Sequence, residues 1–502
     1  MSFRRVLEQI SQLGASTDPV LRSSTYVCQR GGLLTIVRRL GETLARRLPE
    51  GRLVEYRCSN SLVGALGLLA LLDRGFGCVL SPPNQKGTAI RMCGCVLAVA
   101  GDDPDRDPAE WFSIQYPDPD GPDGVQDADR AGETASLTGK LMVRTSGSLG
   151  RAKLVVHSPD RLLQNARYCA ERLGLSSADR VMIPAPIFHM YGLGAGLLPS
   201  MLAGASVALV DRANILHLLE CEEVCAPSVA FLTPSLCRGF IAARKKPRPY
   251  SLTVTAGDVL RPEVFDLYEA RFGPLVNLYG SSELGVIAAS SPDEDVAMRR
   301  VTVGRPLPGV SIECRSPEAS DAPGIGTGEL WVGQSFGFDG YTDEAGRPVL
   351  DQEARRPGAA FATGDLGRPV GNCWQVLGRC DHSANRDGRL VLFSEIEQPL
   401  EKLSGIHQVC VVAAGDHARG TRLIACCVPE RRETLATDHI RKACFDILPR
   451  FAVPDQVIVL DHLPQLANGK IDRMSLVRRI AAADSTAAAD STAADSISAD
   501  NG

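Results

Sequence analysis

The chain has 502 residues, 44% of them hydrophobic and 23% charged, a composition typical of globular proteins. This length exceeds the size at which one hydrophobic core keeps growing, so we expect at least two domains. The net charge is −5, and the tail at residues 481–502 carries acidic but no basic residues. The remainder is therefore close to neutral, which argues against a nucleic-acid partner, because such a surface needs clustered Lys and Arg. The short basic run at residues 243–248 is interpreted as a solvated loop.

The 16 cysteines and 8 histidines do not show the spacing of a metal site. The sequence has no Cys-x-x-Cys pair and no His-Glu-x-x-His motif, so no zinc centre is predicted. The first five residues precede an amphipathic stretch, not the apolar core of a signal peptide. Free thiols without an export signal predict a reducing, cytoplasmic location.

Residues 190–210 carry no charge and are long enough to cross a bilayer. However, the segment stands alone and is interrupted by Pro199 and by glycines, namely Gly192, Gly194, Gly196 and Gly204. We therefore expect a buried helix followed by a buried strand at 205–210, and no membrane span.

Short runs rich in Val, Leu and Ile alternate with helical patterns over most of the chain, which is typical of α/β layers. Runs at 78–80, 180–183 and 228–232 predict buried strands, and Ser158 followed by Pro159 predicts the start of a helix. The fold class predicted is thus α/β.

Changes in composition predict the domain organisation. Residues 101–138 are dense in Asp, Pro and Gly and predict a surface loop or linker, whereas the Gly- and Pro-punctuated strands of 300–378 predict a β-rich subdomain. Two strand-like runs, 408–413 and 422–428, follow in a compact unit. We predict a large N-terminal domain of layered α/β subdomains with the β-rich subdomain, a small mobile α+β C-terminal domain, and a disordered tail, at residues 1–378, 379–480 and 481–502.

The segment from Thr145 to Lys153 combines hydroxyls, glycines and a lysine between two apolar runs. Glycines let backbone N–H groups approach phosphate oxygens, hydroxyls donate hydrogen bonds, and the lysine supplies charge. The segment lacks the Walker A pattern. By itself it fits a phosphate-binding loop or an ordinary Ser/Gly-rich turn.

The segment from Tyr279 to Glu283 follows an apolar run at 274–278. A hydroxyl beside a carboxylate at a strand end can hold a phosphate and its magnesium ion. The alternative is a turn in which Ser282 caps a helix and Glu283 lies in its first turn.

Two later segments carry weaker signals. In Thr363–Gly367, a carboxylate in a tight turn suits the two hydroxyls of a ribose, although Gly-Asp turns are common. In Leu463–Arg473, an Asn-Gly turn precedes Lys470, which could neutralise charge at an attacked phosphate or lie in an ordinary exposed turn.

The order and spacing of these four segments resemble the adenylate-forming superfamily of acyl-CoA synthetases, non-ribosomal peptide adenylation domains and beetle luciferases. The resemblance spans about residues 50–478. It extends to further segments of the sequence, at 186–192, 303–306, 328–332, 378–381 and 448–454.

The resemblance implies a role for each matching residue. The ATP-binding residues would be Thr145, Ser146, Gly147, Ser148, Gly150, Lys153, Ala256, Gly257, Asp258, Tyr279, Gly280, Asp365 and Arg379. Ser282 would contact the α-phosphate, Glu283 would hold magnesium, and Lys470 would bridge the carboxylate and the α-phosphate. Asp381 would be the hinge about which the small domain swings between the two half-reactions. The cofactors implied are ATP, Mg²⁺, and CoA or a carrier-protein phosphopantetheine.

The substrate pocket is expected at His189, Tyr191, Gly192 and Gly285. Amino-acid-activating relatives typically carry an aspartate here to pair the substrate's ammonium, whereas this segment is apolar apart from His189. Four glycines could leave room for a flat or extended apolar acid, namely Gly192, Gly194, Gly196 and Gly285. We therefore expect an aryl or fatty acid as the substrate.

The predicted function is ATP-dependent activation of a carboxylic acid to an acyl-adenylate, followed by thioester formation with CoA. One alternative is a free-standing ligase that loads an acyl or aryl carrier protein. The other is a degenerate nucleotide-binding protein without turnover. Leu149, Ala152 and Leu154 depart from the usual residues of the family's phosphate loop, which bears on the catalytic rate.

Overall fold

A computed structural model of the chain describes residues 3–23, 26–48, 53–85, 90–101, 107, 110–116, 135–145, 153–211, 213–315, 326–349, 360–386, 389–417, 420–430, 436–465 and 471–482. The chain divides into two compact units. The first unit comprises Met1–Thr363 with Gly367–Val376, and the second comprises Gly364–Leu366 with Leu377–Gly502.

The first unit contains a nine-stranded sheet whose central strands run parallel. Its spatial order is β15-β14-β13-β12-β11-β9-β10-β1-β2. The bounds are β1 Pro19–Arg22, β2 Val27–Gln29, β9 Arg180–Ile183, β10 Ser206–Leu209, β11 Val229–Leu232, β12 Leu252–Thr255, β13 Leu275–Ser281, β14 Gly285–Ala289 and β15 Arg305–Pro306. All residues of β10, β11 and β12 are buried, as expected of parallel strands covered on both faces.

An eight-stranded sheet has the order β19-β18-β8-β7-β4-β3-β5-β6. Its strands are β3 Leu53–Arg57, β4 Cys78–Ser81, β5 Cys93–Val99, β6 Phe112–Gln115, β7 Leu141–Thr145, β8 Lys153–His157, β18 Gly340–Thr342 and β19 Pro348–Val349. The prediction of a loop over 101–138 is wrong at residues 112–115, because β6 pairs with β5, and Trp111 and Phe112 are buried. The apolar residues that form this edge strand are few, so the Asp, Pro and Gly around them dominate the composition. Residues 102–106, 108–109 and 117–134 of this predicted loop lie outside the described residues.

The β-rich pattern predicted for 300–378 is confirmed, but its strands join three different sheets. A four-stranded sheet has the order β16-β17-β20-β21, with bounds β16 Val310–Arg315, β17 Gly328–Gln334, β20 Phe361–Val370 and β21 Cys373–Arg379. β15 belongs to the nine-stranded sheet and β18 and β19 to the eight-stranded sheet. The region 300–378 therefore contributes strands to both of the larger sheets.

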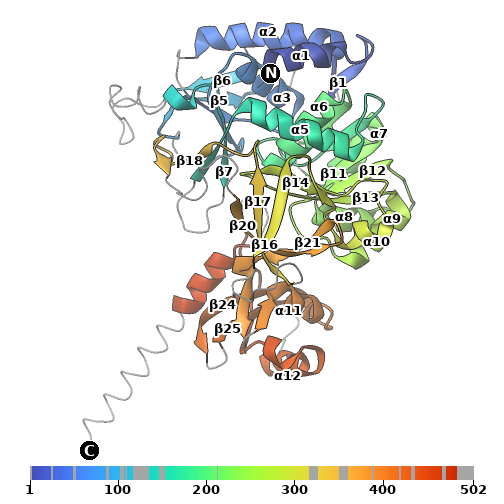
Figure 1. Cartoon of the computed structure of the whole chain (residues 1–502), viewed down its shortest axis with the longest axis vertical. Coiled ribbons are helices and arrows are strands. Elements are labelled where there is room, and N and C mark those ends of the chain that lie inside the picture. Colours follow the sequence, from blue (N-terminus) through green and yellow to red (C-terminus); the bar gives the residue numbers. More distant parts are fainter. Residues whose placement is uncertain are drawn as a thin grey trace, which may run out of the picture. The chain divides into compact units, whose positions relative to one another are not determined.

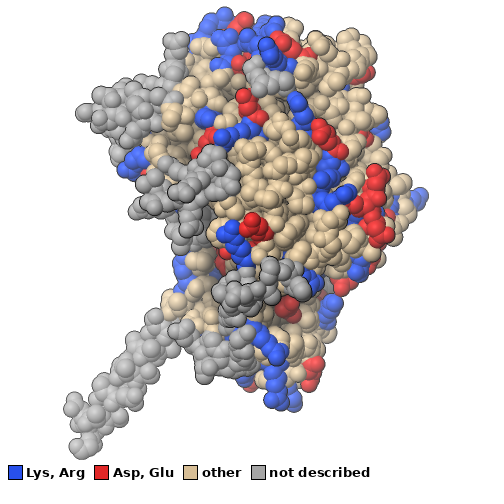
Figure 2. Space-filling view, viewed as in Figure 1, with Lys and Arg blue, Asp and Glu red and all other residues tan. Residues whose placement is uncertain are grey.

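Helices of the first unit surround these sheets (Figure 1). Their bounds are α1 Phe3–Gln12, α2 Arg30–Arg47, α3 Leu62–Asp73, α5 Pro159–Leu173, α6 Leu198–Leu202, α7 Ile215–Cys225, α8 Pro234–Ala243, α9 Pro262–Phe272 and α10 Val296–Val301. α3 is buried along its whole length except for Asp73, because α1 and α2 cover it. Figure 2 shows Lys and Arg gathered on the surface over α1 and α2, where Arg4 and Arg38 pair with Asp73 and Glu8.

The predicted helix after Ser158 is confirmed as α5, although the serine side chain does not cap it. The basic run at 243–248 is more than the solvated loop predicted. Arg244 and Arg248 form ion pairs at 2.6 and 3.3 Å with Glu222, whose side chain is only 1% exposed. A buried carboxylate needs such partners, since an unpaired charge in the interior is costly.

The uncharged segment at 190–210 is a helix followed by the buried strand β10, as predicted. The first part of the helix, Tyr191–Leu197, is π-helical and continues into α6. Within the described residues, no helix combines the length and the hydropathy needed to cross a membrane.

The second unit contains a five-stranded sheet, β23-β22-β25-β24, with β26 paired to β25. Its elements are β22 Ser383–Arg386, β23 Arg389–Leu392, β24 Ile406–His417, β25 Gly420–Pro429, β26 Gln456–Val459, α11 Phe393–Leu400 and α12 Thr437–Ile447, and residues 473–482 form a further helix. β24 and β25 contain the two predicted strand runs. The α/β fold class is confirmed, and the tail at 483–502 lies outside the described residues.

A buried ion pair holds the start of this sheet. Arg386 is fully buried, and its Nη2 donates to Asp455 Oδ1 at 3.0 Å. We expect Arg386→Ala to destabilise the second unit by about 3–5 kcal/mol, because the variant removes the buried cation that is paired with the Asp455 carboxylate. Hydrogen exchange of the β24 and β25 amides measures this free energy within the unit. Lys442→Ala, at an exposed position of α12, serves as the control. Unchanged protection in Arg386→Ala would contradict the prediction.

Candidate active site

Several predicted site residues follow the carboxyl ends of parallel strands in the nine-stranded sheet. The segment before His189 follows β9, residues 256–258 follow β12, and residues 282–283 follow β13. β9, β11, β12 and β13 are successive neighbours in the sheet. Ligands of α/β proteins bind at this edge, where the loops after the strands meet. The topology thus places these residues along one edge of one sheet.

Ser282 and Glu283 lie in a tight turn between the antiparallel strands β13 and β14. The alternative in which Ser282 caps a helix is therefore wrong, because the chain reverses into a strand. Two glycines permit the reversal. A Cβ atom at Gly280 would lie 2.4 Å from the Gly285 carbonyl oxygen, and Gly285 itself has a φ of +65°.

Asn165 of α5 holds the start of β14. Its Nδ2 donates to the Val286 carbonyl at 2.7 Å, and its Oδ1 accepts from the Val286 N–H at 2.9 Å. A Cβ atom at Gly285 would lie 2.6 Å from this Oδ1. The space beside Gly285 is therefore filled by Asn165, which corrects the prediction that this glycine leaves room for a substrate.

The Ser282–Glu283 turn is held by a buried histidine that the sequence analysis did not identify. His157, at the end of β8, is 3% exposed, and its Nε2 lies 2.8 Å from the Ser282 carbonyl oxygen. Because a carbonyl only accepts, Nε2 carries the proton and donates it. Burial lowers the pKa of His157 to about 4, although the hydrogen bond to Ser282 opposes the shift. The imidazole is thus neutral at pH 7.

Tyr341 of β18 contacts two of the predicted site residues. Its hydroxyl donates a hydrogen bond to Glu283 Oε1 at 2.9 Å, and Lys153 Nζ lies 5.1 Å from the centre of its ring. The distance to Lys153 is that of a cation–π contact. Lys153 and Glu283 are thus brought together around one aromatic side chain. Tyr341 was not among the residues predicted from the sequence, because a tyrosine in a short strand has no distinguishing spacing.

The segment 338–341 is itself fixed to both sheets. The Phe338 N–H donates to the Glu283 carbonyl at 3.0 Å, and the Asp339 N–H donates to the Val156 carbonyl at 2.7 Å. Asp339 also accepts hydrogen bonds from Lys140 and Ser158. Burial by itself would raise the pKa of Asp339, but these hydrogen bonds and the nearby positive charges outweigh it and lower the pKa.

Part of the predicted phosphate loop and the predicted catalytic lysine lie outside the described residues. They are Ser146, Gly147, Ser148, Gly150 and Lys470, together with the departures Leu149 and Ala152. The two ends of the loop are described. Thr145 closes β7 and pairs with Lys153, which begins β8. Leu154 is fully buried in β8.

Ala256, Gly257 and Asp258 form the turn after β12. Gly257 has a φ of +94°, and the Asp258 carboxylate accepts a hydrogen bond from the Val259 N–H at 2.8 Å. Tyr279, in the neighbouring strand β13, is buried. Because β12 and β13 are adjacent parallel strands, the turn after β12 lies near the end of β13. One site can therefore include residues of both segments.

Two of the predicted substrate residues, Tyr191 and Gly192, lie in the π-helical segment. The Tyr191 hydroxyl lies 2.8 and 2.9 Å from the carbonyl oxygens of Leu232 and Val254, at the ends of β11 and β12. Burial raises the pKa of Tyr191 well above its ordinary value. A Cβ atom at Gly192 would lie 2.3 Å from the Ala185 carbonyl oxygen. Gly192 is thus required by close backbone packing, which corrects the prediction that it leaves substrate space.

His189 lies just before the π-helical segment Tyr191–Leu197, and its ring packs against Phe188 with centroids 4.7 Å apart. The backbone carbonyl of His189 accepts from the Leu193 N–H at 3.0 Å. The side chain is half-buried. His189 therefore lies in the segment that follows the carboxyl end of β9.

Asp365, Arg379 and Asp381 come together within the second unit. Arg379 Nη1 lies 3.3 Å from Asp365 Oδ1, and Arg379 Nε lies 3.3 Å from Asp381 Oδ1. Burial would lower the pKa of Arg379, but the two carboxylates outweigh it and raise the pKa. Gly364 has a φ of +69°, and a Cβ atom there would lie 3.0 Å from Arg379 Nη2. The predicted ribose-binding pair and the predicted hinge residue are therefore neighbours.

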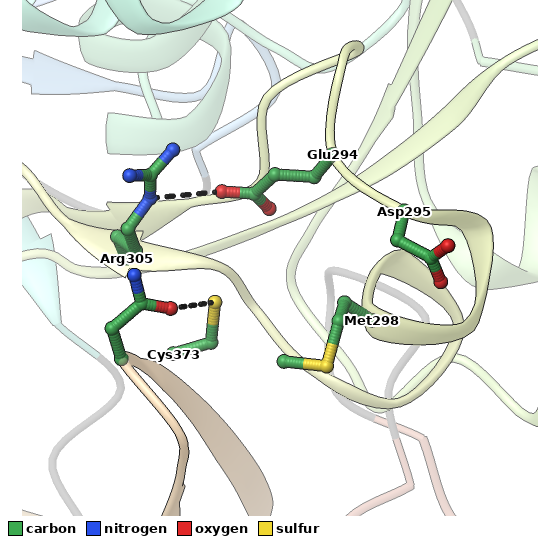
Figure 3. Close-up of a pocket in the computed structure, with 6 residues that line it drawn as sticks. Glu294, Asp295, Met298, Arg305 and Cys373 are labelled. Carbon is green, nitrogen blue, oxygen red and sulfur yellow. Dashed lines mark hydrogen bonds and ion pairs between the residues drawn. The ribbon is translucent and has the colours of Figure 1, made fainter.

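A separate pocket in the first unit involves none of the predicted residues (Figure 3). Its volume is about 210 Å³, and it is lined by Glu294, Asp295, Met298, Arg305, Asn372 and Cys373. Pockets for drug-sized ligands usually measure about 300–1,000 Å³. Glu294 is paired with Arg305 at 3.1 Å across its wall. The pocket is small and distinct from the candidate site.

We expect the stability of the first unit to fall as the pH is lowered from about 6.5 to about 4. In this window the unfolded chain binds a proton at His157 that the folded chain does not bind, because the pKa in the folded state is about 4. The full effect is about 3 kcal/mol. His157→Gln keeps an N–H donor but does not titrate, so its thermal unfolding midpoint should depend less on pH. The exposed His439→Gln is the control, and an unchanged acid dependence in His157→Gln would contradict the assignment.

Two family models match the chain, and together they span more than half of it. The model described as "AMP-binding enzyme" matches residues 130–342, and the model described as "AMP-binding enzyme C-terminal domain" matches residues 395–470. The first match contains the residues around Lys153, Glu283 and Tyr341. The second ends at Lys470.

Curated relatives are similar over large parts of the chain. An indoleacetate–CoA ligase of Aromatoleum aromaticum is 29% identical over 75% of this chain and 74% of its own length. A salicylyl-CoA synthase / salicylate adenylyltransferase of a Streptomyces species is 29% identical over 67% of this chain and 62% of its own length. Tyrocidine synthase 3 of Brevibacillus parabrevis is 33% identical over 45% of this chain, which is 4% of that much longer protein.

Solved structures share the fold. ATP-bound MatB of Rhodopseudomonas palustris has a TM-score of 0.76 at 18% identity, covering 95% of this chain and 99% of that one. The o-succinylbenzoate coenzyme A synthetase of Bacillus subtilis, in complex with AMP, has a TM-score of 0.76 at 20% identity, covering 94% and 97%. The two family models and the curated relatives confirm the predicted resemblance: the chain belongs to the adenylate-forming superfamily of AMP-binding enzymes.

Proposed function

We propose that the chain is an acid–thiol ligase that converts a carboxylic acid and ATP into an acyl-adenylate and then transfers the acyl group to a thiol. The observation that carries this proposal is the arrangement around Tyr341, which brings Lys153 and Glu283 together beside the Ser282 turn. A cation and a carboxylate so placed suit the phosphates and the metal of ATP.

In the first half-reaction a carboxylate oxygen attacks the α-phosphorus of ATP, and pyrophosphate leaves. Charge accumulates on the phosphates, so catalysis rests on positioning and electrostatic stabilisation, without a side-chain nucleophile. We assign Lys153 to the β- and γ-phosphates with Thr145, Ser146 and Ser148, and Ser282 to the α-phosphate. Lys470 neutralises charge between the carboxylate and the α-phosphate.

Glu283 is the residue that suits a magnesium ion. Carboxylate oxygens are preferred ligands of this ion. Tyr341 is the one hydrogen-bond donor to the Glu283 carboxylate among the described residues, so the other oxygen keeps its capacity to bind. When bound, magnesium would neutralise the negative charge of the phosphates.

We assign the nucleoside of ATP to two groups of residues. Ala256, Gly257 and Asp258 line the base, and Asp365 with Arg379 binds the ribose hydroxyls. A carboxylate and a guanidinium 3.3 Å apart can together accept and donate hydrogen bonds to a diol. Asp381, also in contact with Arg379, is assigned to the hinge.

In the second half-reaction the thiol sulfur attacks the acyl carbon, and AMP leaves. We propose free CoA as the acceptor, since two relatives that match 75% and 67% of the chain are named an indoleacetate–CoA ligase and a salicylyl-CoA synthase / salicylate adenylyltransferase. A carrier-protein phosphopantetheine is the second candidate, which the similarity to tyrocidine synthase 3 favours.

We propose an aromatic carboxylic acid as the substrate. The two relatives just named act, by their names, on indoleacetate and salicylate, both aromatic acids. The His189 segment is otherwise apolar and offers no carboxylate for a substrate ammonium. A half-buried imidazole suits the polar end or the ring edge of such an acid.

We expect carboxylate-dependent exchange of labelled pyrophosphate into ATP for a panel of aryl, fatty and amino acids to give its strongest signal with an aryl acid. Lys470→Ala should lower the exchange at least about 100-fold, because it removes the charge that stabilises the transition state. Its thermal unfolding midpoint should stay unchanged. The matched control is Lys246→Ala, an exposed lysine outside the site. Full exchange by Lys470→Ala would contradict the role of this lysine.

We expect the purified enzyme, given its acid and ATP, to release AMP and form a thioester when free CoA is added. The same assay with an acylatable carrier protein, followed by intact-protein mass spectrometry, separates the two acceptors. If only the carrier protein is acylated and free CoA is not, the acceptor is the carrier protein and not CoA. Absence of exchange with every acid, while ATP still binds, would contradict the ligase function itself.

A further inference from the structure

Tyr341 contacts both charged side chains that the proposed function assigns to ATP and its metal. Its hydroxyl donates to Glu283 Oε1 at 2.9 Å, while Lys153 Nζ lies 5.1 Å from its ring centre. Tyr341 is 9% exposed. One buried side chain therefore uses its polar tip for a carboxylate and its ring for an ammonium.

The backbone of Tyr341 provides a fixed reference for these contacts. Tyr341 pairs with Val155 in β8, and its ring packs against Phe338 with centroids 4.9 Å apart. Phe338 in turn donates its N–H to the Glu283 carbonyl at 3.0 Å. The segment 338–341 thus holds the backbone of Glu283 through Phe338, and the Tyr341 hydroxyl holds its side chain.

Glutamate and lysine are flexible side chains, and ordering them when a ligand binds lowers the affinity. A hydrogen bond to one carboxylate oxygen restricts the rotation of Glu283 before any ligand arrives. Outer partners of this kind orient metal ligands, and their loss typically weakens metal binding about 10- to 100-fold. The contact of Lys153 with the ring restricts the ammonium in the same way.

We propose that Tyr341 is a positioning residue for adenylation, which orients Glu283 toward the metal and Lys153 toward the phosphates of ATP. This inference rests on the proposed function. It assigns the two contacts of Tyr341 to separate tasks: the hydroxyl serves the metal, and the ring serves the phosphates.

Two substitutions separate these tasks. Tyr341→Phe removes the hydroxyl and keeps the ring, whereas Tyr341→Leu removes both. We expect calorimetric titration with ATP to show that magnesium tightens binding to the wild-type enzyme. For Tyr341→Phe this gain should be at least about tenfold smaller, with unchanged affinity for magnesium-free ATP. Tyr341→Leu should in addition weaken the binding of magnesium-free ATP.

A double substitution tests whether the hydroxyl acts through Glu283. In a Glu283→Gln background, Tyr341→Phe should cause no further loss of the magnesium-dependent gain, because the two residues act as a unit. Independent, additive losses would overturn the assignment. Tyr116→Phe is the matched control. The Tyr116 hydroxyl also donates a hydrogen bond, 2.6 Å long, to the Arg47 carbonyl, but it is not a residue of the site.

Pyrophosphate exchange distinguishes failure of this inference from failure of the proposed function. Tyr341→Phe should need a higher magnesium concentration for half-maximal exchange and recover activity in excess magnesium, with unchanged KM for the acid. Wild-type magnesium dependence in both assays, in an active enzyme, would overturn the inference alone. A wild-type enzyme that binds ATP but exchanges no pyrophosphate would overturn the proposed function, and the inference with it.

Discussion

The candidate site depends on the hydrogen bond between His157 and the carbonyl of Ser282. This bond joins the eight-stranded sheet, which carries His157 and Lys153, to the nine-stranded sheet, which carries the Ser282–Glu283 turn. It requires a neutral imidazole with its proton on Nε2, and burial provides that state by lowering the pKa to about 4. A charged imidazole at this position would lack a solvation shell. The position of the turn is therefore secured by the same burial that keeps the histidine from titrating near neutral pH.

Much of this arrangement follows from patterns that are local in sequence. Apolar runs of four or five residues marked strands such as β9 and β11, because burial leaves a direct trace in composition. Ser158-Pro159 marked the start of α5, because proline suits the first position of a helix even though the Ser158 side chain does not cap it. The weak pattern at Phe112 did not predict β6, since two buried aromatic residues stand within a region dense in Asp, Pro and Gly. The Ser282–Glu283 turn was identified as a possible site, but whether a helix or a strand follows it depends on Asn165, far away in the chain.

The residues that support the site were harder to predict than those assigned to the ligand. Glu283 and Lys153 stand in segments with a recognisable order along the chain, whereas His157 and Tyr341 have no such spacing and gain their role only from tertiary contacts. Two glycines, in contrast, were predicted to have a role in the site that the structure does not support. Gly192 and Gly285 suggested open space for a substrate, but carbonyl and amide oxygens occupy that space. A sequence records that a side chain is absent, not what fills its place.

The contacts around Tyr341 also have a consequence for how the site comes into being during folding. His157 and Ser282 are 125 residues apart in the chain, and Glu283 and Tyr341 are 58 apart. Contacts of such long range form late, because closing large loops must precede any gain from the contact. A chain that has formed only one of the two sheets lacks the contacts between His157 and Ser282 and between Glu283 and Tyr341. The site residues are then not yet brought together. If the proposed site binds ATP, nucleotide affinity reports the docking of the two sheets, and ATP stabilises only chains in which the sheets have docked.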